Sequence, residues 1–368
     1  MKIFFAGTQG FERTYPEIKP YLKHRLVSYH YMTPSLDKFF MSERDESLVM
    51  EDLIMDSGAF SAWSQGLSID FEDYIRYCLR HLEHIDYVVN LDVIPAKPGQ
   101  KSISQEEIER SASGGWRNAQ RMLRSGVPKE KLIHVFHQNE NFKWLERMVQ
   151  EFDYIGLSPA NDRTTAEKMI WLDQCMPYVT DSTGAPTIKF HGFAVTAHSL
   201  MMRYPWFSVD SASWCQQSGR GVVWIPPFRN TEPVYDEMPY SVRIGNNSPF
   251  EKEAVHFNNH PPKLQALFLK YLESKGHVLG ESSCRQLAAG EKKGNKGFLR
   301  FCRKRKGCNQ VVPPERCVEE VVVPGIINKY GIRAVVNAQY ICDLEDSMVP
   351  WPNKNFNIKL LRSNGFNF

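Results

Sequence analysis

The sequence has no long apolar segment, little net charge and no glycine-rich nucleotide-binding motif, and each absence excludes a class of protein. No apolar run approaches the roughly 20 residues that span a bilayer, so we expect no membrane partner. With 45 Lys and Arg against 42 Asp and Glu, the formal net charge is only +3, too small for a protein that binds polyanions with its whole surface. No GxGxxG follows the first predicted strand, which argues against a dinucleotide fold. The N-terminal apolar run ends at Thr8 after about five residues, shorter than a secretory signal, and suits a strand better.

Cysteines are sparse over most of the chain. Cys78, Cys175 and Cys215 stand far apart, which suits reduced thiols in an intracellular, cytoplasmic protein. The other five of the eight cysteines lie between residues 284 and 342. Cysteines this close together can bind a metal, and the spacing between them is the first test of that possibility.

What the sequence does contain is a regular alternation of β-rich runs and helical patterns. Eight short runs predict buried strands, at 2–7, 25–32, 53–58, 87–94, 132–138, 154–159, 188–195 and 206–211. The clearest amphipathic segments between them lie at 71–85, 105–126, 141–152 and 166–176. Eight strands with helical connections predict a parallel α/β architecture, and the count favours a closed (β/α)8 TIM barrel over an open sheet.

The pattern changes near residue 220, which predicts a barrel domain over 1–220 and a C-terminal extension over 221–368. The extension is expected to hold a strand, a loop and a helix, at 222–228, 230–250 and 262–276. Between 285 and 306, nine Lys or Arg stand against one Glu, so the extension is basic as well as rich in cysteine. Such a segment suits nucleic-acid phosphates, although a solvated loop has the same composition.

Several predicted strands end in a polar side chain, and TIM-barrel enzymes build their sites from the C-terminal ends of their strands. The strand-end residues are Asp56, Asp92, Gln138, Ser158, His191 and Asp210. Two of them lie in Asp-Ser motifs, LIMDSGAF at 53–60 and WFSVDSASW at 206–214. We expect the two carboxylates to meet at one end of the barrel.

A pair of carboxylates suits displacement at a sugar carbon. One acid captures the anomeric centre as a nucleophile, and the other protonates the leaving group and then deprotonates its replacement. Any single Asp of this kind could instead cap a helix or hold a turn. Three acids at one end of a barrel favour catalysis over that alternative.

The ordered motifs DSGAF, NLDVI, FHQNE, IGLSPA, HGFAV and SVDSASW resemble the tRNA-guanine transglycosylase superfamily over about residues 50–215. The resemblance implies that Asp210 is the nucleophile that forms a covalent glycosyl-enzyme intermediate, and that Asp56 is the general acid/base. It further implies base-binding roles for Ser57, Phe60, Asp92, Gln138 and Gly156. Phe60 matches an aromatic residue that stacks on the purine, which suits a flat ring. Asp92 matches the acid that accepts from guanine N1 and its amine.

The resemblance assigns Gln138 and the backbone N–H of Gly156 to the carbonyl edge of the base. Ser57 is expected to make a polar contact to the base. His191 in HGFAV could bind near the site or satisfy a core carbonyl, and we leave it outside the predicted catalytic pair.

The chain departs from the tRNA enzymes in lacking their compact C-x-C-x-x-C zinc motif. The gaps between Cys302, Cys308 and Cys317 do not match a short zinc knuckle, so a remodelled structural zinc site and free thiols both stay open. No other cofactor is expected.

This departure and the basic cluster make the chain more similar to the 7-deazaguanine DNA transglycosylases of phages and bacteria. The resemblance implies replacement of guanine in DNA by a 7-deazaguanine base, the 7-cyano form above all. It also implies a host cytoplasmic location if the protein is phage-encoded. A guanine within a duplex would first have to be flipped out or met in opened DNA. The alternatives are the same chemistry on tRNA, a nucleoside or base hydrolase, and a non-catalytic nucleic-acid-binding barrel.

Overall fold

The computed structural model describes residues 1–9, 11–38, 50–95, 100, 103–245, 255–286, 288–290, 299–301 and 317–352. The chain divides into two compact units. The first comprises Met1–Ala212 and Glu345–Phe368, and the second is Ser213–Leu344. The sequence placed its domain boundary at 220 and assigned the end of the chain to the extension, whereas the barrel unit takes the last residues from Glu345 onward.

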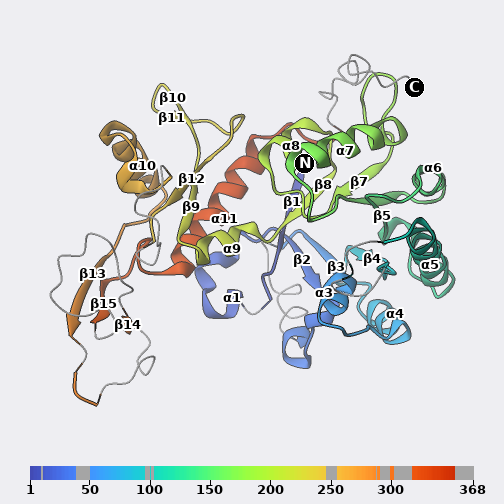
Figure 1. The fold of residues 1–368 in the computed structure, drawn as a ribbon, viewed down its shortest axis with the longest axis horizontal. Helices are drawn as coiled ribbons and strands as arrows, with labels where there is room; N and C mark the ends of the chain where they lie inside the picture. The colour runs from blue at the N-terminus through green and yellow to red at the C-terminus, as the bar shows by residue number, and fades with distance from the viewer. Residues whose placement is uncertain are drawn as a thin grey trace. The chain divides into compact units, whose positions relative to one another are not determined.

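The first unit is a closed barrel of eight parallel strands that pair in sequence order, with helices outside it (Figure 1). The strands are β1 (Lys2–Ala6), β2 (His24–Ser28), β3 (Asp52–Asp56), β4 (Tyr87–Val89), β5 (Leu132–His137), β6 (Tyr154–Ser158), β7 (Lys189–Gly192) and β8 (Ser208–Ser211). Each lies within or beside one of the eight predicted runs. The predicted (β/α)8 TIM barrel is therefore confirmed.

The helices of this unit are α1 (Phe11–Thr14), α3 (Ala59–Ser64), α4 (Phe71–Arg80), α5 (Gln105–Arg124), α6 (Phe142–Glu151), α7 (Thr165–Val179) and α8 (His198–Arg203). The long ones start at polar caps. Ser104 and Glu107 form a reciprocal capping box at α5, and Thr164 and Glu167 form another at α7. The four predicted amphipathic segments correspond to α4, α5, α6 and α7, although α4 ends at Arg80 rather than at residue 85.

The barrel is closed by pairing of its first and last strands, with Phe4 in register with Asp210. Its interior holds large apolar side chains, among them Phe4, Ile54, Ile133, Tyr154 and Phe207. Burying such residues supplies about 1.5–3 kcal/mol each and fills the barrel as a core rather than a channel. Because all eight strands run the same way, their C-terminal ends meet at one rim.

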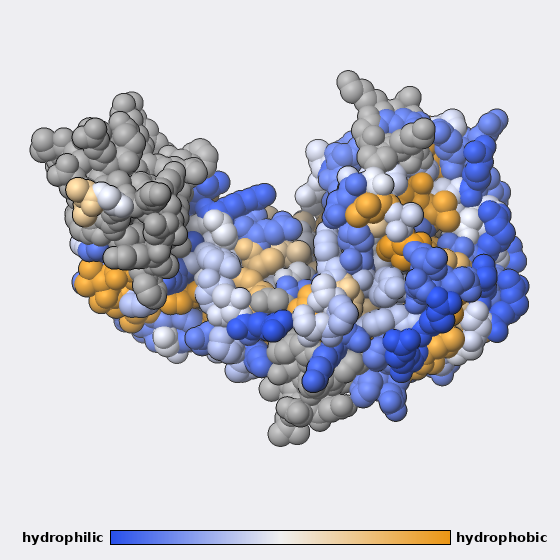
Figure 2. Space-filling view, turned by 90° about the horizontal axis from the view of Figure 1, so that it is seen from below, coloured by the Kyte–Doolittle hydropathy of each residue, from blue (hydrophilic) through white to orange (hydrophobic). Residues whose placement is uncertain are grey.

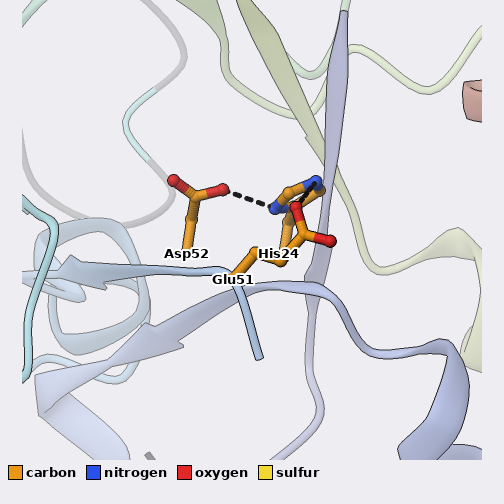
Figure 3. Close-up of side chains that lie close together, drawn as sticks. All are labelled: His24, Glu51 and Asp52. Atoms are coloured by element: carbon orange, nitrogen blue, oxygen red, sulfur yellow. Dashed lines mark ion pairs between the residues drawn. The ribbon is translucent and has the colours of Figure 1, made fainter. Parts of the chain in front are cut away.

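The opposite end is held by an ionic network of residues that begin strands. Lys2, His24 and Asp52 each start a strand, and Asp52 Oδ2 lies 2.6 Å from both Lys2 Nζ and His24 Nδ1. Glu345 binds His24 Nε2 at 2.9 Å and accepts from the Ile3 N–H at 2.8 Å. Figure 3 shows His24 facing Asp52 and Glu51 across this end of the barrel. The network joins the starts of three strands to Glu345, which belongs to the same unit.

The second unit contains α9 (Ser213–Gly219), β9 (Val222–Ile225), β10 (Phe228–Arg229), β11 (Glu232–Pro233), β12 (Tyr240–Arg243), α10 (Pro262–Ser274), β13 (Glu281–Gln286), β14 (Leu299–Phe301), β15 (Cys317–Val323) and α11 (Tyr330–Ser347). The predicted strand at 222–228 and helix at 262–276 are present as β9 and α10. The predicted loop at 230–250 is wrong, because β12 pairs antiparallel with β9 there. The strand β12 has only four residues, and only Val242 among them is fully buried, so its hydrophobic pattern is too short to recognise in the sequence.

Buried polar groups hold the second unit around α11, which the sequence analysis missed. The Asn337 amide donates to Trp214 O and Val222 O and accepts from the Trp224 N–H at 2.8 Å. The Arg333 guanidinium is buried and donates to Ser218 O and Ile326 O. Because α11 carries polar and charged residues on its buried side, a search for an apolar stripe passes over it.

Apolar groups on the face shown in Figure 2 are separated by hydrophilic residues. The most exposed large apolar side chains include Met238, Val322, Leu67, Ile170 and Phe60. Among the residues that the structure describes, no helix is long and apolar enough to cross a membrane.

The network at the start of the strands predicts that stability depends on the protonation of His24. Burial alone would lower the pKa of His24, but the Asp52 and Glu345 carboxylates outweigh it and raise that pKa to about 9. The stabilisation is therefore complete below pH 6.5 and disappears as the pH rises through about 9. We expect His24→Gln to lower the free energy of unfolding. This loss should be larger at pH 6 than at pH 10, by up to ~3 kcal/mol. Urea unfolding of both proteins checks this; a difference that stays constant with pH would contradict it.

Candidate active site

The turn after β3 folds its own backbone onto the carboxylate of Asp56, the last residue of that strand. The Gly58 N–H donates to Asp56 Oδ2 at 3.0 Å. Gly58 has φ +77°, and a Cβ there would lie 2.3 Å from Ser28 Oγ and 2.4 Å from His30 Cβ. Only glycine combines this left-handed backbone with this close approach. The Asp-Ser-Gly motif is thus explained by the local fold as well as by chemistry.

The carboxyl group of Asp56 holds its proton unusually strongly. Burial, followed by the charges of Asp92 and then Asp210, raises the pKa of Asp56 to about 7, against donation from the Gly58 and Ser57 N–H groups. The three predicted acids therefore lie close enough to influence one another. A carboxyl group with a pKa near 7 can both give and take a proton at neutral pH, as general acid/base catalysis requires.

Asp210 lies in β8, buried at 8% exposure, and is bound by N–H donors. His191 Nε2 is 3.3 Å from Asp210 Oδ1, and the Ala194 N–H donates to the same oxygen at 2.8 Å. Ala194 has φ +52°, a strained conformation that costs on the order of 1–3 kcal/mol in a residue other than glycine. Both hydrogen bonds that the described residues make to this carboxylate reach Oδ1.

Asp92 follows β4 and is bound by a histidine that the sequence analysis overlooked. His137 Nε2 is 3.2 Å from Asp92 Oδ2, and His137 Nδ1 is 3.3 Å from Glu140 Oε1. Burial alone would lower the pKa of His137, but the charges of Asp92 and Glu140 raise it well above the usual value. This ion pair orients the Asp92 carboxyl group beside the end of β5.

Three of the predicted base-binding residues, Gln138, Ser57 and Phe60, lie in the segments that follow β3 and β5. Gln138 Oε1 accepts from the Ala160 N–H at 2.9 Å, which orients its amide group and leaves N–H donors for a ligand. Ser57 is buried, and its Oγ accepts from the Ala59 N–H at 3.4 Å. Phe60 is 55% exposed, so its ring face is accessible.

A pocket of about 410 Å³ opens beside these residues. Phe60, His137 and Gln138 line it, together with apolar residues that include Val93 and Ile94. The three acids are not among its lining residues, although His137, which binds Asp92, is. A flat, largely apolar ring suits such a wall, with a polar edge toward Gln138.

Gly156, predicted to offer its N–H to the base, has a ring packed against its Cα. It lies in the middle of β6, paired with Val135 and His191 in the neighbouring strands. A Cβ on Gly156 would meet the Phe193 ring at 2.4 Å, so that ring occupies the space that the glycine leaves. The glycine therefore permits close packing of Phe193, and the predicted contact of its N–H with a base stays a prediction.

The predicted metal ligands give no site in the part of the chain that is described. Cys302 and Cys308 lie outside the described residues, and Cys317 begins β15 with a side chain that is not described. His24, Glu51 and Asp52 do approach one another closely enough to share an ion. His24, however, already binds Asp52 and Glu345, and with a pKa of about 9 it keeps both ring protons at neutral pH. These residues fit an ionic network better than a metal site.

Sequence reasoning found the acids and named His191 without pairing it with Asp210, but it missed His137, Glu140 and Ala194. A signal for two of them was present, because FHQNE places His137 and Glu140 three residues apart beside Gln138. HGFAV gave His191 but no reason to pair it with Asp210. The donor at Ala194 is a backbone group with φ +52°, which residue type does not reveal.

No protein-family model matches this chain, and no curated protein sequence matches it. The fold is therefore established by the barrel itself. The resemblance to guanine transglycosylases stays a prediction that depends on the motifs and on the geometry of the acids.

The raised pKa of Asp56 predicts that its charge destabilises the native protein. Below pH 3.8 the carboxyl is protonated in both states; as the pH rises to about 7 the unfolded chain ionises first, so folding stability falls. We expect Asp56→Asn to be more stable than the wild type at pH 8 by up to ~4 kcal/mol, and to lose this advantage at pH 3.5.

Chemical unfolding at both pH values checks this expectation. Asp153→Asn is a matched control, because Asp153 is 55% exposed and pairs with Lys129 at the surface. An Asp56→Asn protein that is no more stable than the wild type at pH 8 would show that Asp56 is not held in a charge-disfavouring site.

Proposed function

We propose that the protein is a base-exchange pentosyltransferase that replaces guanine in DNA with a 7-deazaguanine, 7-cyano-7-deazaguanine in particular. The observation that carries the proposal is the unlike environment of two acids at one barrel rim. Asp56 has a pKa of about 7 and suits proton transfer, whereas Asp210 is bound by two N–H donors through one oxygen and keeps the other for attack. This division of roles is the one that a two-step displacement at a sugar carbon needs.

In the first step, Asp210 Oδ2 attacks C1′ and the C1′–N9 bond breaks, with the electron pair leaving on guanine. Asp56 gives its proton to the departing base. In the second step, Asp56 takes a proton from the incoming base, whose nitrogen attacks C1′ and displaces Asp210. No electrons are exchanged with a cofactor in either step. The overall reaction replaces one base by another and needs no redox or nucleotide cofactor.

The base-recognition part of the proposal uses the other residues of the rim. A purine stacked on Phe60 would present its N1 and amine to Asp92, whose carboxyl group is oriented by its ion pair with His137. The Gln138 amide, oriented by Ala160, would donate to the carbonyl edge. These contacts recognise the pyrimidine edge that guanine and 7-deazaguanines share, so both bases can occupy one pocket.

The choice of DNA over tRNA depends on the sequence resemblance and on the basic cluster at 285–306, most of which lies outside the described residues. Incubation with radiolabelled guanine and either DNA or tRNA tests it. We expect label to enter DNA, and single-stranded or mismatched DNA faster than a perfect duplex, because the guanine need not be unpaired first. Label in tRNA alone would replace the DNA proposal, and release of guanine without incorporation would indicate a hydrolase.

The proposed roles predict different defects for the two acids. Asp210→Asn should form no denaturation-resistant protein–DNA adduct, because its amide is a poor nucleophile. Asp56→Asn should still form the adduct, but about 10²–10⁴-fold more slowly, as expected on losing a general acid. In the wild type, adduct formation should slow as the pH rises above about 7, because Asp56 then loses its proton.

Rapid-quench gel assays with end-labelled DNA measure all three rates, with Asp153→Asn as the control for an unrelated Asp. An undiminished adduct in Asp210→Asn would assign the nucleophile to another residue. A pH profile of adduct formation shared by Asp56→Asn and the wild type would remove Asp56 from the acid role.

A further inference from the structure

A string of buried polar side chains leads to the carboxylate of Asp210. The Tyr154 hydroxyl contacts Ser208 Oγ, and Ser208 Oγ lies 2.6 Å from His191 Nδ1. His191 Nε2 in turn lies 3.3 Å from Asp210 Oδ1. Tyr154, His191 and Ser208 have no exposed surface, so water does not compete for these contacts. A buried chain of this kind fixes the orientation of every member.

The donors in this string can be assigned from its two ends. Burial raises the pKa of Tyr154 well above the usual value, so the phenol keeps its proton, and the acceptors within its reach are Ser208 Oγ and His191 Nδ1, the latter at 3.5 Å. The Ser208 hydroxyl then has its own proton free for His191 Nδ1. With Nδ1 accepting, the ring proton is on Nε2, where it donates to Asp210 Oδ1. The string thus selects the tautomer that can bind a carboxylate.

We propose that His191 is a positioning residue that stabilises Asp210 as a leaving group, an inference that rests on the base-exchange function proposed above. The string holds Oδ1, so Oδ2 forms the bond to C1′. In the covalent intermediate Oδ1 is then the carbonyl oxygen of an ester. When the incoming nitrogen attacks C1′, the C1′–Oδ2 bond breaks and its electron pair returns to the carboxylate. The developing charge spreads onto Oδ1, where the N–H groups of His191 and Ala194 already point.

The two half-reactions therefore depend on His191 in opposite senses. Hydrogen bonds to Oδ1 stabilise the free carboxylate more than the ester, because the carboxylate carries the full charge. Removing the His191 donor leaves Asp210 no worse as a nucleophile and makes it a poorer leaving group. The adduct should therefore accumulate while overall exchange slows. A histidine that only packs the core has no reason to affect the two steps unequally.

The experiment measures the two steps separately in the full-length protein. Adduct formation is followed with end-labelled guanine-containing DNA, and adduct resolution is followed after addition of excess unlabelled guanine. We expect His191→Leu to slow resolution on the order of 10²–10³-fold, the scale of losing one oxyanion donor, with formation slowed by no such factor. The fraction of protein held as adduct at steady state should rise accordingly.

Two further variants separate positioning from folding. His191→Gln keeps an N–H donor near the position of Nε2 and should restore resolution to within several-fold of the wild type. Ser208→Ala leaves Nδ1 without its donor, releases the tautomer and should slow resolution in the same direction as His191→Leu, by a smaller factor. His84→Gln, in the turn before β4 and so at the start of the strands, is the matched control. Thermal unfolding of each variant identifies any that do not fold.

The outcomes are distinct. Equal slowing of formation and resolution in His191→Leu, or equal impairment of His191→Gln and His191→Leu, would overturn the positioning role while leaving base exchange intact. A wild type that forms no adduct with DNA or tRNA and incorporates no guanine would instead overturn the proposed function, and this inference with it.

Discussion

The organisation of the site depends on closure of the barrel between its first and last strands. Pairing of β1 with β8 puts Phe4 in register with Asp210 and brings the end of the chain's eighth strand beside its first. An open sheet would leave β3 and β8 at separate positions along its width. In the closed barrel the charges of Asp92 and Asp210 both reach Asp56 and raise its pKa. Acids more than 150 positions apart in the sequence become one electrostatic unit through this closure.

Each of the three acids at the rim has hydrogen-bond donors or a cation beside it, and the number and kind of these partners differ from one acid to the next. Asp92 has the His137 imidazolium, and Asp210 has the Nε2 of His191 and the N–H of Ala194. Asp56 has backbone N–H groups, and these do not outweigh its burial and its two negative neighbours. Asp56 accordingly has a pKa raised to about 7. The proton-transfer role that we propose for Asp56 depends on this weak compensation rather than on a special residue type.

The sequence predicted the barrel because its strands are short, apolar and regularly separated by amphipathic helices. It predicted Asp56, Asp92 and Asp210 because each stands at or just beyond a strand end. It could not predict β12, where Val242 alone is fully buried, nor α11, whose buried side carries Arg333 and Asn337. Nor could it pair His191 with Asp210, because that contact needs the register of β7 against β8. Patterns along one element are visible in a sequence, whereas contacts between elements depend on register.

The two ends of the barrel use the same residue types for opposite purposes. At the start of the strands, His24 lies between Asp52 and Glu345 and Asp52 also binds Lys2, so opposite charges are matched and the arrangement stabilises the fold. At the other rim, carboxylates crowd one another and Ala194 adopts a strained backbone, so the arrangement costs stability. A barrel that needed only to fold would gain by replacing Asp56 with a neutral residue. A charge-disfavouring acid beside an accessible aromatic ring and an oriented amide is the arrangement that the proposed base exchange would use, whereas a rim with only a structural role would not need it.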